Sequence, residues 1–128
     1  MSVYSRIYDA SYSPAAPVVD IIVKAAEEPI VTVEIEALVD SGADATLLPL
    51  AILEEVGASY YETRRMRGIT SSASSVDLYL VTLQIGPVTI RGVRAVALLQ
   101  SREALLGRDV LNQIRLTLDG PAEVLEID

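Results

Sequence analysis

Hydrophobic and polar residues alternate along the segment that precedes position 40. Between positions 31 and 39, Val, Ile and Ala occupy every second position, with Thr and Glu among the residues between them. An alternation with a period of two is typical of a half-buried β-strand. This strand leads directly into Asp40, which Ser41 and Gly42 follow. The pattern therefore places an acidic side chain in a tight turn at the end of a partly buried strand.

Other short apolar segments predict further strands, and Gly, Pro and small polar residues separate them. The expected strands cover residues 18–24, 60–67, 76–85, 88–99 (as one strand or two), 116–118 and a last edge strand at 123–127. Short helices are expected at 49–56, closed by Gly57, and at 107–114. Many short strands with few helices predict a mostly β fold, a closed or partly open barrel. We expect an irregular N-terminal arm at residues 1–17, followed by one domain over 18–128.

The composition is typical of a globular protein. Hydrophobic residues make up 51% of the 128 residues, and a chain of this length can form a single core. No apolar run approaches the roughly 18–20 residues of a membrane span. The N-terminus lacks the basic start and the apolar stretch of a signal peptide. We therefore expect a soluble, cytoplasmic protein with no membrane partner.

The charge and the missing residue types narrow the possible chemistry. The formal net charge of -8 disfavours binding to nucleic acid, and the arginines at positions 64, 65 and 67 are too few to reverse this. The chain has no cysteine and no histidine. Cysteine nucleophiles, disulfides, Ser-His-Asp triads and the usual zinc sites are therefore excluded. A hydrolase built from this chain would use carboxylates, or a metal bound by carboxylates.

Asp40 is the leading candidate for such chemistry. A carboxylate beside buried apolar surface is costly unless it is hydrogen-bonded, paired or protonated. Gly42 allows a sharp turn with its N–H near the carboxylate, and Thr46 adds a further hydroxyl. A purely structural alternative is an Asx turn in which Asp40 caps backbone groups. Peptide hydrolysis by carboxylates needs two of them, and a two-fold dimer would supply the second from another copy of the chain.

A second segment, residues 104–114, follows an apolar strand and contains Leu-Leu-Gly-Arg-Asp before the expected helix. Together with residues 37–49, it resembles the retropepsin family of dimeric aspartic proteases. That family combines an apolar run into Asp-Thr/Ser-Gly-Ala, a flap hairpin and a Gly-Arg-Asn/Asp motif before a short helix. The resemblance covers roughly residues 30–120. It implies a single-lobe closed β-barrel with a flap hairpin and one or two short helices.

The resemblance also implies roles for particular residues. Asp40 would be the catalytic aspartate, one in each subunit, and the active-site loop would comprise Ser41, Gly42 and Ala43. Asp44 would contact the substrate backbone and form a bidentate pair with Arg108.

The flap would lie within residues 68–75, with its tip at Gly68, Ile69, Thr70, Ser71 and Ser72. This tip is serine-rich where the family has glycines. In the family, terminal strands of the two subunits interleave to join the dimer. Here the N-terminal arm and the last strand could form a different dimer sheet.

Three functions remain open on the sequence. The first is a homodimeric aspartic endopeptidase that cuts polypeptides through a water activated by two Asp40 carboxylates, with no metal or cofactor. The second is a catalytically inactive dimer that binds extended peptides by strand addition, as the serine-rich flap suggests. The third is a metal hydrolase that uses Asp40 and Asp44, although a tight turn does not obviously bring these two carboxylates together.

Overall fold

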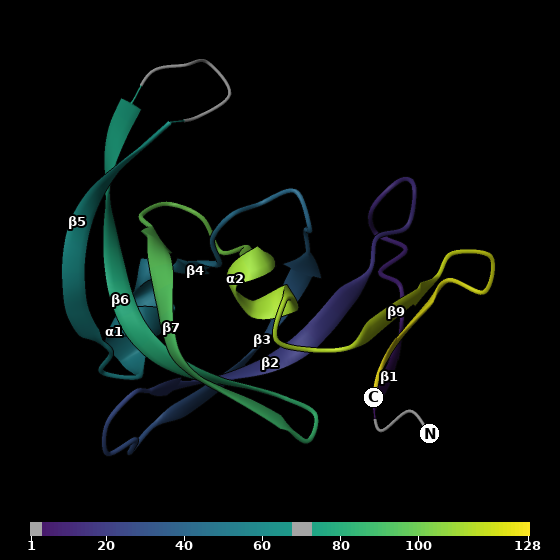
Figure 1. Cartoon of the computed structure of the whole chain (residues 1–128), viewed down its shortest axis with the longest axis horizontal. Coiled ribbons are helices and arrows are strands. Elements are labelled where there is room, and N and C mark those ends of the chain that lie inside the picture. Colours follow the sequence, from purple (N-terminus) through teal and green to yellow (C-terminus); the bar gives the residue numbers. More distant parts are fainter. Residues whose placement is uncertain (1–3, 68–72) are drawn as a thin grey trace.

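The computed structural model describes residues 4–67 and 73–128, and this part of the chain is mostly β-strand (Figure 1). Neither helix in the described part is long and apolar enough to cross a membrane. The elements in chain order are β1 (Tyr4–Ile7), β2 (Val18–Ala25), β3 (Thr32–Val39), β4 (Leu47–Pro49), α1 (Leu50–Glu55), β5 (Ser59–Arg67), β6 (Ala73–Ile85), β7 (Val88–Leu98), β8 (Ala104–Leu106), α2 (Arg108–Leu111), β9 (Leu116–Asp119) and β10 (Val124–Ile127).

The larger sheet closes on itself and forms a barrel. Its strand order is β2-β3-β8-β4-β7-β6-β5, and β2 also pairs with β6. Among the described residues, this extra pairing joins six strands in a ring and leaves β5 outside it, attached to β6. Most neighbouring strands are antiparallel, but β8 runs parallel to β3 and β4 runs parallel to β7. The closed, mostly β barrel with short helices that the sequence predicts is therefore confirmed.

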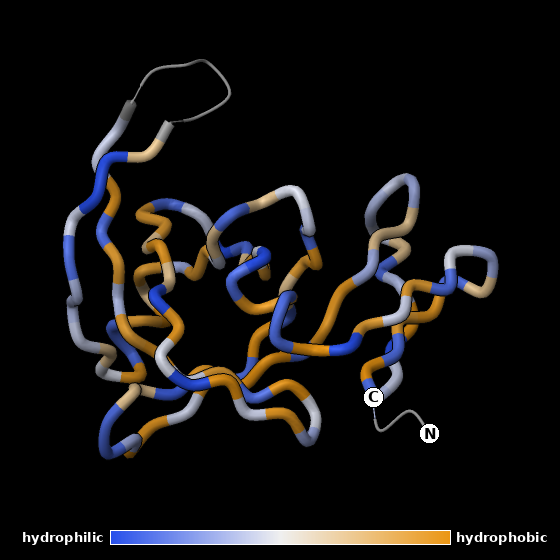
Figure 2. The backbone as a smooth tube through the Cα atoms, viewed as in Figure 1, coloured by the Kyte–Doolittle hydropathy of each residue, from blue (hydrophilic) through white to orange (hydrophobic). Residues whose placement is uncertain are grey.

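The barrel encloses the hydrophobic core. Alternate residues of β2, namely Val19, Ile21 and Val23, are fully buried and pack in one cluster with Leu83 and Ile85 of β6. Complete burial of one such side chain contributes about 1.5–3 kcal/mol. Figure 2 shows β5 as largely hydrophilic, in contrast to β6 beside it, as expected for a strand outside the ring.

Both ends of the chain contribute to a second, three-stranded sheet with the order β1-β10-β9. The sequence predicts an irregular arm at residues 1–17, but Tyr4–Ile7 form a strand. The sequence also predicts an edge strand at the C-terminal end, whereas β10 is the central strand of this sheet. A four-residue strand shows too short an alternation to stand out, and its partner lies at the other end of the sequence. Leu125 and Ile127 are fully buried and join the barrel core, so this sheet packs against the barrel.

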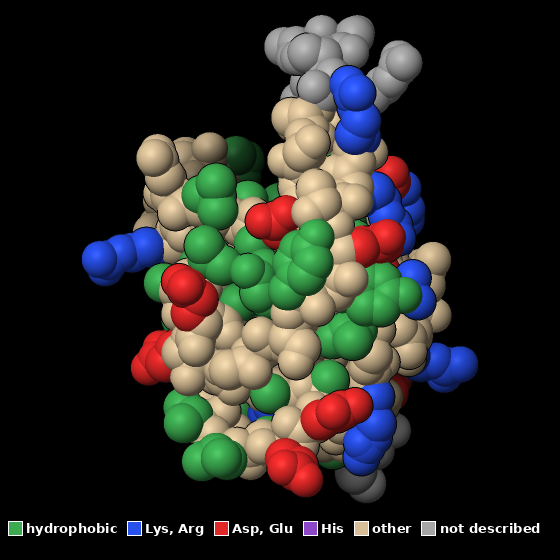
Figure 3. Space-filling view, turned by 90° about the vertical axis from the view of Figure 1, so that its left-hand side faces the viewer, with side chains coloured by type: hydrophobic (Ala, Val, Ile, Leu, Met, Phe, Trp, Pro, Cys, Tyr) green, Lys and Arg blue, Asp and Glu red, His purple; other side chains and the backbone are tan. Residues whose placement is uncertain are grey.

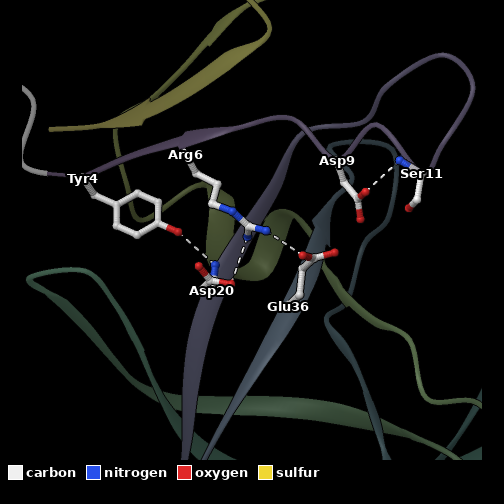
Figure 4. A network of polar contacts seen from close by, with 6 residues as sticks. All are labelled: Tyr4, Arg6, Asp9, Ser11, Asp20 and Glu36. Atoms are coloured by element: carbon white, nitrogen blue, oxygen red, sulfur yellow. Dashed lines mark hydrogen bonds and ion pairs between the residues drawn. The ribbon is translucent and has the colours of Figure 1, made fainter.

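Polar contacts attach β1 to the barrel (Figure 4). The Arg6 guanidinium donates to Asp20 Oδ1 on β2 at 2.9 Å and to Glu36 Oε2 on β3 at 2.7 Å. The hydrogen bond to Glu36 is the main cause of the raised pKa of Arg6. The Asp20 N–H donates to Tyr4 Oη at 2.9 Å. The N-terminal strand is thereby held beside β2 and β3, and β3 is the strand that leads to Asp40.

Several strands and helices also begin or end at residues other than those predicted from the sequence. The short strands β4 and β8 are absent from the sequence prediction, because three apolar residues carry no measurable period. The helix α1 begins after Pro49, whose ψ of 135° is not helical, and Gly57 follows with a φ of +71°. Residues 73–75, which lie within the expected flap region 68–75, belong to β6. The remaining tip, residues 68–72, lies outside the described residues.

Candidate active site

The neighbouring strands fix the backbone at Asp40. β3 lies between β2 and β8, and the Val39 N–H donates to the Pro17 carbonyl at 3.1 Å. The Asp40 N–H donates to the Leu106 carbonyl, at the end of β8, also at 3.1 Å. Asp40 therefore follows a strand that is hydrogen-bonded on both sides, and its side chain is half-buried.

A tight turn folds the chain back toward the Asp40 carboxylate. The Gly42 N–H donates to Asp40 Oδ1 at 2.9 Å, and the Ala43 N–H donates to the Asp40 carbonyl at 3.2 Å. A β-carbon at position 42 would lie 3.2 Å from Oδ1, a tight contact that glycine avoids. The turn thus holds one carboxylate oxygen in place through a backbone donor.

Arg108, at the start of α2, ties this turn to the C-terminal half of the chain. Its N–H donates to the Ala43 carbonyl at 2.9 Å. Its Nη1 donates to the Ser41 carbonyl at 2.7 Å, and its Nη2 forms an ion pair with Asp44 Oδ1. Arg108 therefore contacts Asp44 through one nitrogen, and the bidentate geometry that we expected from the sequence is not seen. The loop wraps around the guanidinium and presents a carbonyl and a carboxylate to its two terminal nitrogens.

A network of hydrogen bonds around the buried Thr46 connects the segment after the active-site loop to the start of α2. Thr46 is fully buried, and its Oγ1 donates to Asp109 Oδ1 at 2.8 Å while its N–H donates to Asp109 Oδ2 at 3.2 Å. The Gly107 N–H donates to Thr46 Oγ1 at 3.2 Å, and the Val110 N–H donates to Asp109 Oδ1 at 2.9 Å. These contacts satisfy the buried Thr46 hydroxyl and give the partly buried Asp109 carboxylate three donors.

The contact between Asp109 and Thr46 does not follow from the sequence, although Asp109 belongs to the recognisable Gly-Arg-Asp motif. A threonine beside an apolar run signals a buried hydroxyl that needs a partner, but the partner here is 63 residues away. Gly107 also has a role that the sequence does not reveal. A β-carbon there would lie 2.6 Å from the Ala45 backbone, so the loop and the β8–α2 connection pack too closely for any side chain.

The structure brings together six of the residues singled out in the sequence: Asp40, Ser41, Gly42, Ala43, Asp44 and Arg108. The predicted flap residues Gly68, Ile69, Thr70, Ser71 and Ser72 lie outside the described part of the chain. Within the described residues, no three acidic side chains come together in a group that could hold a metal ion.

Comparisons with known proteins agree with this arrangement. A family described as "gag-polyprotein putative aspartyl protease" matches residues 29–113, which is more than half of the chain and includes Asp40 and Arg108. The crystal structure of a retropepsin-like aspartic protease from Rickettsia conorii has a similar fold, with a TM-score of 0.60. That similarity covers 99% of this chain and 94% of the other, at 16% sequence identity. No curated protein matches the sequence. The barrel, the Asp-Ser-Gly turn and the family match together show that the chain belongs to the gag-polyprotein aspartyl protease family, with a retropepsin-like fold.

Proposed function

We propose that this protein is a homodimeric aspartic endopeptidase in which each subunit contributes Asp40. The observation that carries the proposal is the fixed position of the Asp40 turn. Leu106 holds its start, Arg108 holds the Ser41 and Ala43 carbonyls, and Gly42 holds a carboxylate oxygen. A reacting group that is positioned before the substrate arrives needs no reorganisation during the reaction. The family match supports the same chemistry.

The dimer supplies the second carboxyl. The chain contains one Asp-Ser-Gly turn, and a residue near a two-fold axis meets its own image in the partner. Two carboxyls held close together cannot both ionise readily, so they share one proton. This gives the site one acid and one base at mildly acidic pH.

The reaction follows from these two protonation states. The ionised carboxylate takes a proton from a water while the water oxygen bonds to the scissile carbonyl carbon. The protonated carboxyl gives its proton to the carbonyl oxygen, which forms a neutral gem-diol. The carboxyl that took the proton from water then gives it to the amide nitrogen as the carbon–nitrogen bond breaks, while the other, now ionised, carboxylate takes a proton from a hydroxyl of the gem-diol, which leaves an amine and a carboxylic acid. One proton remains shared between the two Asp40 side chains at the end, so the site is regenerated without a covalent intermediate.

The remaining site residues position the peptide and the loop. Asp44 has a largely exposed side chain, which suits it to contact the backbone of an extended peptide at the loop. Arg108 acts as a positioning residue because it contacts Ser41 and Asp44 rather than Asp40. The β5–β6 hairpin, which carries residues 68–72 at its end, would cover the bound peptide as the flap.

Cleavage of a mixed peptide library from acidic to neutral pH tests the proposal. We expect Asp40→Asn to lower the cleavage rate about 10³-fold or more, because an amide cannot act as the base. Asp119→Asn, an exposed position in β9, serves as the matched control and should cleave like the wild type. Equal cleavage by Asp40→Asn would overturn the proposal. Peptide binding without cleavage by the folded wild-type dimer would favour the inactive peptide-binding alternative.

A further inference from the structure

A cavity of about 350 Å³ lies beside the active-site loop but does not include Asp40. Asp44 and Ala45 line one side of it, and α2 with its C-terminal extension, through Asp109 and Gln113, lines another. Strands β5, β6 and β7 complete it. Its volume is at the lower end of the range for small-ligand sites and is ample for one substrate side chain. Asp44, which lines the cavity, directly follows the active-site loop Ser41–Ala43, so the cavity adjoins the loop that a bound peptide would cross.

The acidic groups of the cavity are already bound by the protein. Asp44 forms its ion pair with Arg108. Asp109 accepts hydrogen bonds from the Thr46 hydroxyl, the Thr46 N–H and the Val110 N–H. Both carboxylates therefore already have partners, a cation for Asp44 and three hydrogen-bond donors for Asp109.

The two arginines that line the cavity, Arg64 and Arg94, differ in their contacts. Arg64 on β5 is paired with Glu62 of the same strand. Arg94 on β7 has its guanidinium carbon 4.6 Å from the centre of the Tyr61 ring, and among the described residues it forms no ion pair or side-chain hydrogen bond. Stacking on an aromatic face orients a guanidinium and leaves its N–H groups, which lie at the edge of its plane, able to donate. Figure 3, viewed from the β5 side, shows Lys and Arg side chains concentrated toward the right-hand edge of this face.

The remaining walls suit an aliphatic stem. Met66 of β5 and Leu78 of β6 line the cavity, and Leu78 is almost fully buried. Gly92 of β7 has a φ of +70°, with no atom within 4 Å of the position that a β-carbon would take. The cavity thus combines apolar walls, open space at Gly92 and a guanidinium with unused donors.

We propose that this cavity is a specificity site for an acidic side chain of the substrate, best matched by glutamate, with Arg94 as the residue that binds its carboxylate. This inference rests on the proposed function, since it assigns the cavity to a bound peptide. The methylenes of glutamate would contact Met66 and Leu78 while its carboxylate reaches Arg94. An acidic protein with a net charge of -8 would otherwise repel acidic peptides, so such a preference requires a local arginine.

Binding measured in the Asp40→Asn background tests this inference without any need for cleavage. The probes are decapeptides of Val, Thr and Gln that carry a single Glu, which is placed at each position in turn. The reference for each probe is the same peptide with Gln in place of that Glu. We expect a Glu at one position to bind about 5-fold more tightly than Gln at low salt, the size typical of one partly exposed charge pair. Arg94→Gln should abolish this difference. Arg91→Gln, on the same strand but outside the cavity lining, should preserve it.

Three results would overturn the inference. They are equal affinity for Glu and Gln at every position, no binding of any peptide, and a Glu preference that survives Arg94→Gln. A Glu preference in a protein that shows no Asp40-dependent cleavage would leave the cavity assignment standing and would refute the endopeptidase proposal alone.

Discussion

Two polar networks cross-link distant segments of this chain, and they differ mainly in burial. Behind the active-site loop, Thr46 is 0% exposed, and it joins Asp109 across 63 positions of sequence. On the terminal sheet, Arg6 joins Asp20 and Glu36, and the three side chains are 26%, 42% and 39% exposed. The first network combines backbone and side-chain donors, whereas the Arg6 contacts are ion pairs near solvent.

The buried network lies next to the active-site loop, whereas the exposed ion pairs attach the terminal sheet to the barrel. Loss of a partner costs about 1–3 kcal/mol when it leaves a buried polar group unpaired, but typically about 1 kcal/mol or less for an exposed ion pair. Loss of the Thr46 hydroxyl, which ties the segment after the Asp40 turn to Gly107 and Asp109, should therefore cost more stability than loss of the Arg6 ion pairs. The terminal sheet depends more on the burial of Leu125 and Ile127 than on Arg6.

The largest effect is expected from Gly107→Ala. The added β-carbon would meet the Ala45 backbone at 2.6 Å, and backbone on both sides cannot move away easily. The φ of -94° at Gly107 is accessible to any residue, so the cost comes from this contact. We expect the free energy of unfolding in urea to fall by about 2–4 kcal/mol. Gly120→Ala, with no atom near its β-carbon position, is the control, and equal losses from both variants would contradict the close packing described for Gly107.

Thr46→Val should have the next largest effect. Valine keeps the shape but removes the hydroxyl, which leaves the Gly107 N–H unpaired and takes one donor from Asp109. Urea denaturation should show a loss of about 1–3 kcal/mol. Thr117→Val, at an exposed position of β9, should change stability by less than about 0.5 kcal/mol. If the two variants were equally stable, the buried network would not support the loop.

Arg6→Gln should have a smaller effect, which sharpens the contrast between the two networks. Both ion pairs are lost, but the groups left behind are accessible to water. We expect a loss of about 1 kcal/mol or less, which decreases as salt is added. Thermal denaturation at low and high ionic strength measures it, with Arg91→Gln as the control. A loss as large as that of Thr46→Val would show that burial does not distinguish the two networks.

The smallest effect concerns Asp9, which lies near the Arg6 network in Figure 4. Hydrogen bonds from Ser11 lower the pKa of Asp9 below its ordinary value of 3.8. The stabilising contribution is therefore present above that value and is lost as the pH falls through the lower folded-state pKa. Ser11→Ala should raise the pKa of Asp9 in an NMR titration, whereas Ser5→Ala should leave it unchanged. An unchanged Asp9 pKa in Ser11→Ala would show that the Ser11 side chain has no part in the shift.

The sequence predicts the strand before Asp40 and the mostly β barrel, because both depend on periods that extend over many residues. It does not predict β1, β4 or β8, since strands of three or four residues are stabilised by partners far away in the sequence.

The same limit applies at the site. The Asp40 turn and Arg108 are recognisable from local motifs, and the structure places them in contact through the Ser41 carbonyl. The pairing of Thr46 with Asp109 and the close approach of Gly107 to Ala45 are products of the folded barrel. Neither follows from the spacing of residues along the chain.

Mixing wild-type subunits with Asp40→Asn subunits tests the central claim most directly. Total protein concentration is held constant, the two species are allowed to exchange, and the initial rate of peptide cleavage is measured against the wild-type fraction. If each active site needs Asp40 from both chains, random pairing leaves about one quarter of the activity at an equal mixture. Mixtures with Arg91→Gln in place of Asp40→Asn should retain full activity. A rate that falls in direct proportion to the wild-type fraction would show that one chain contains a complete active site and would contradict the account.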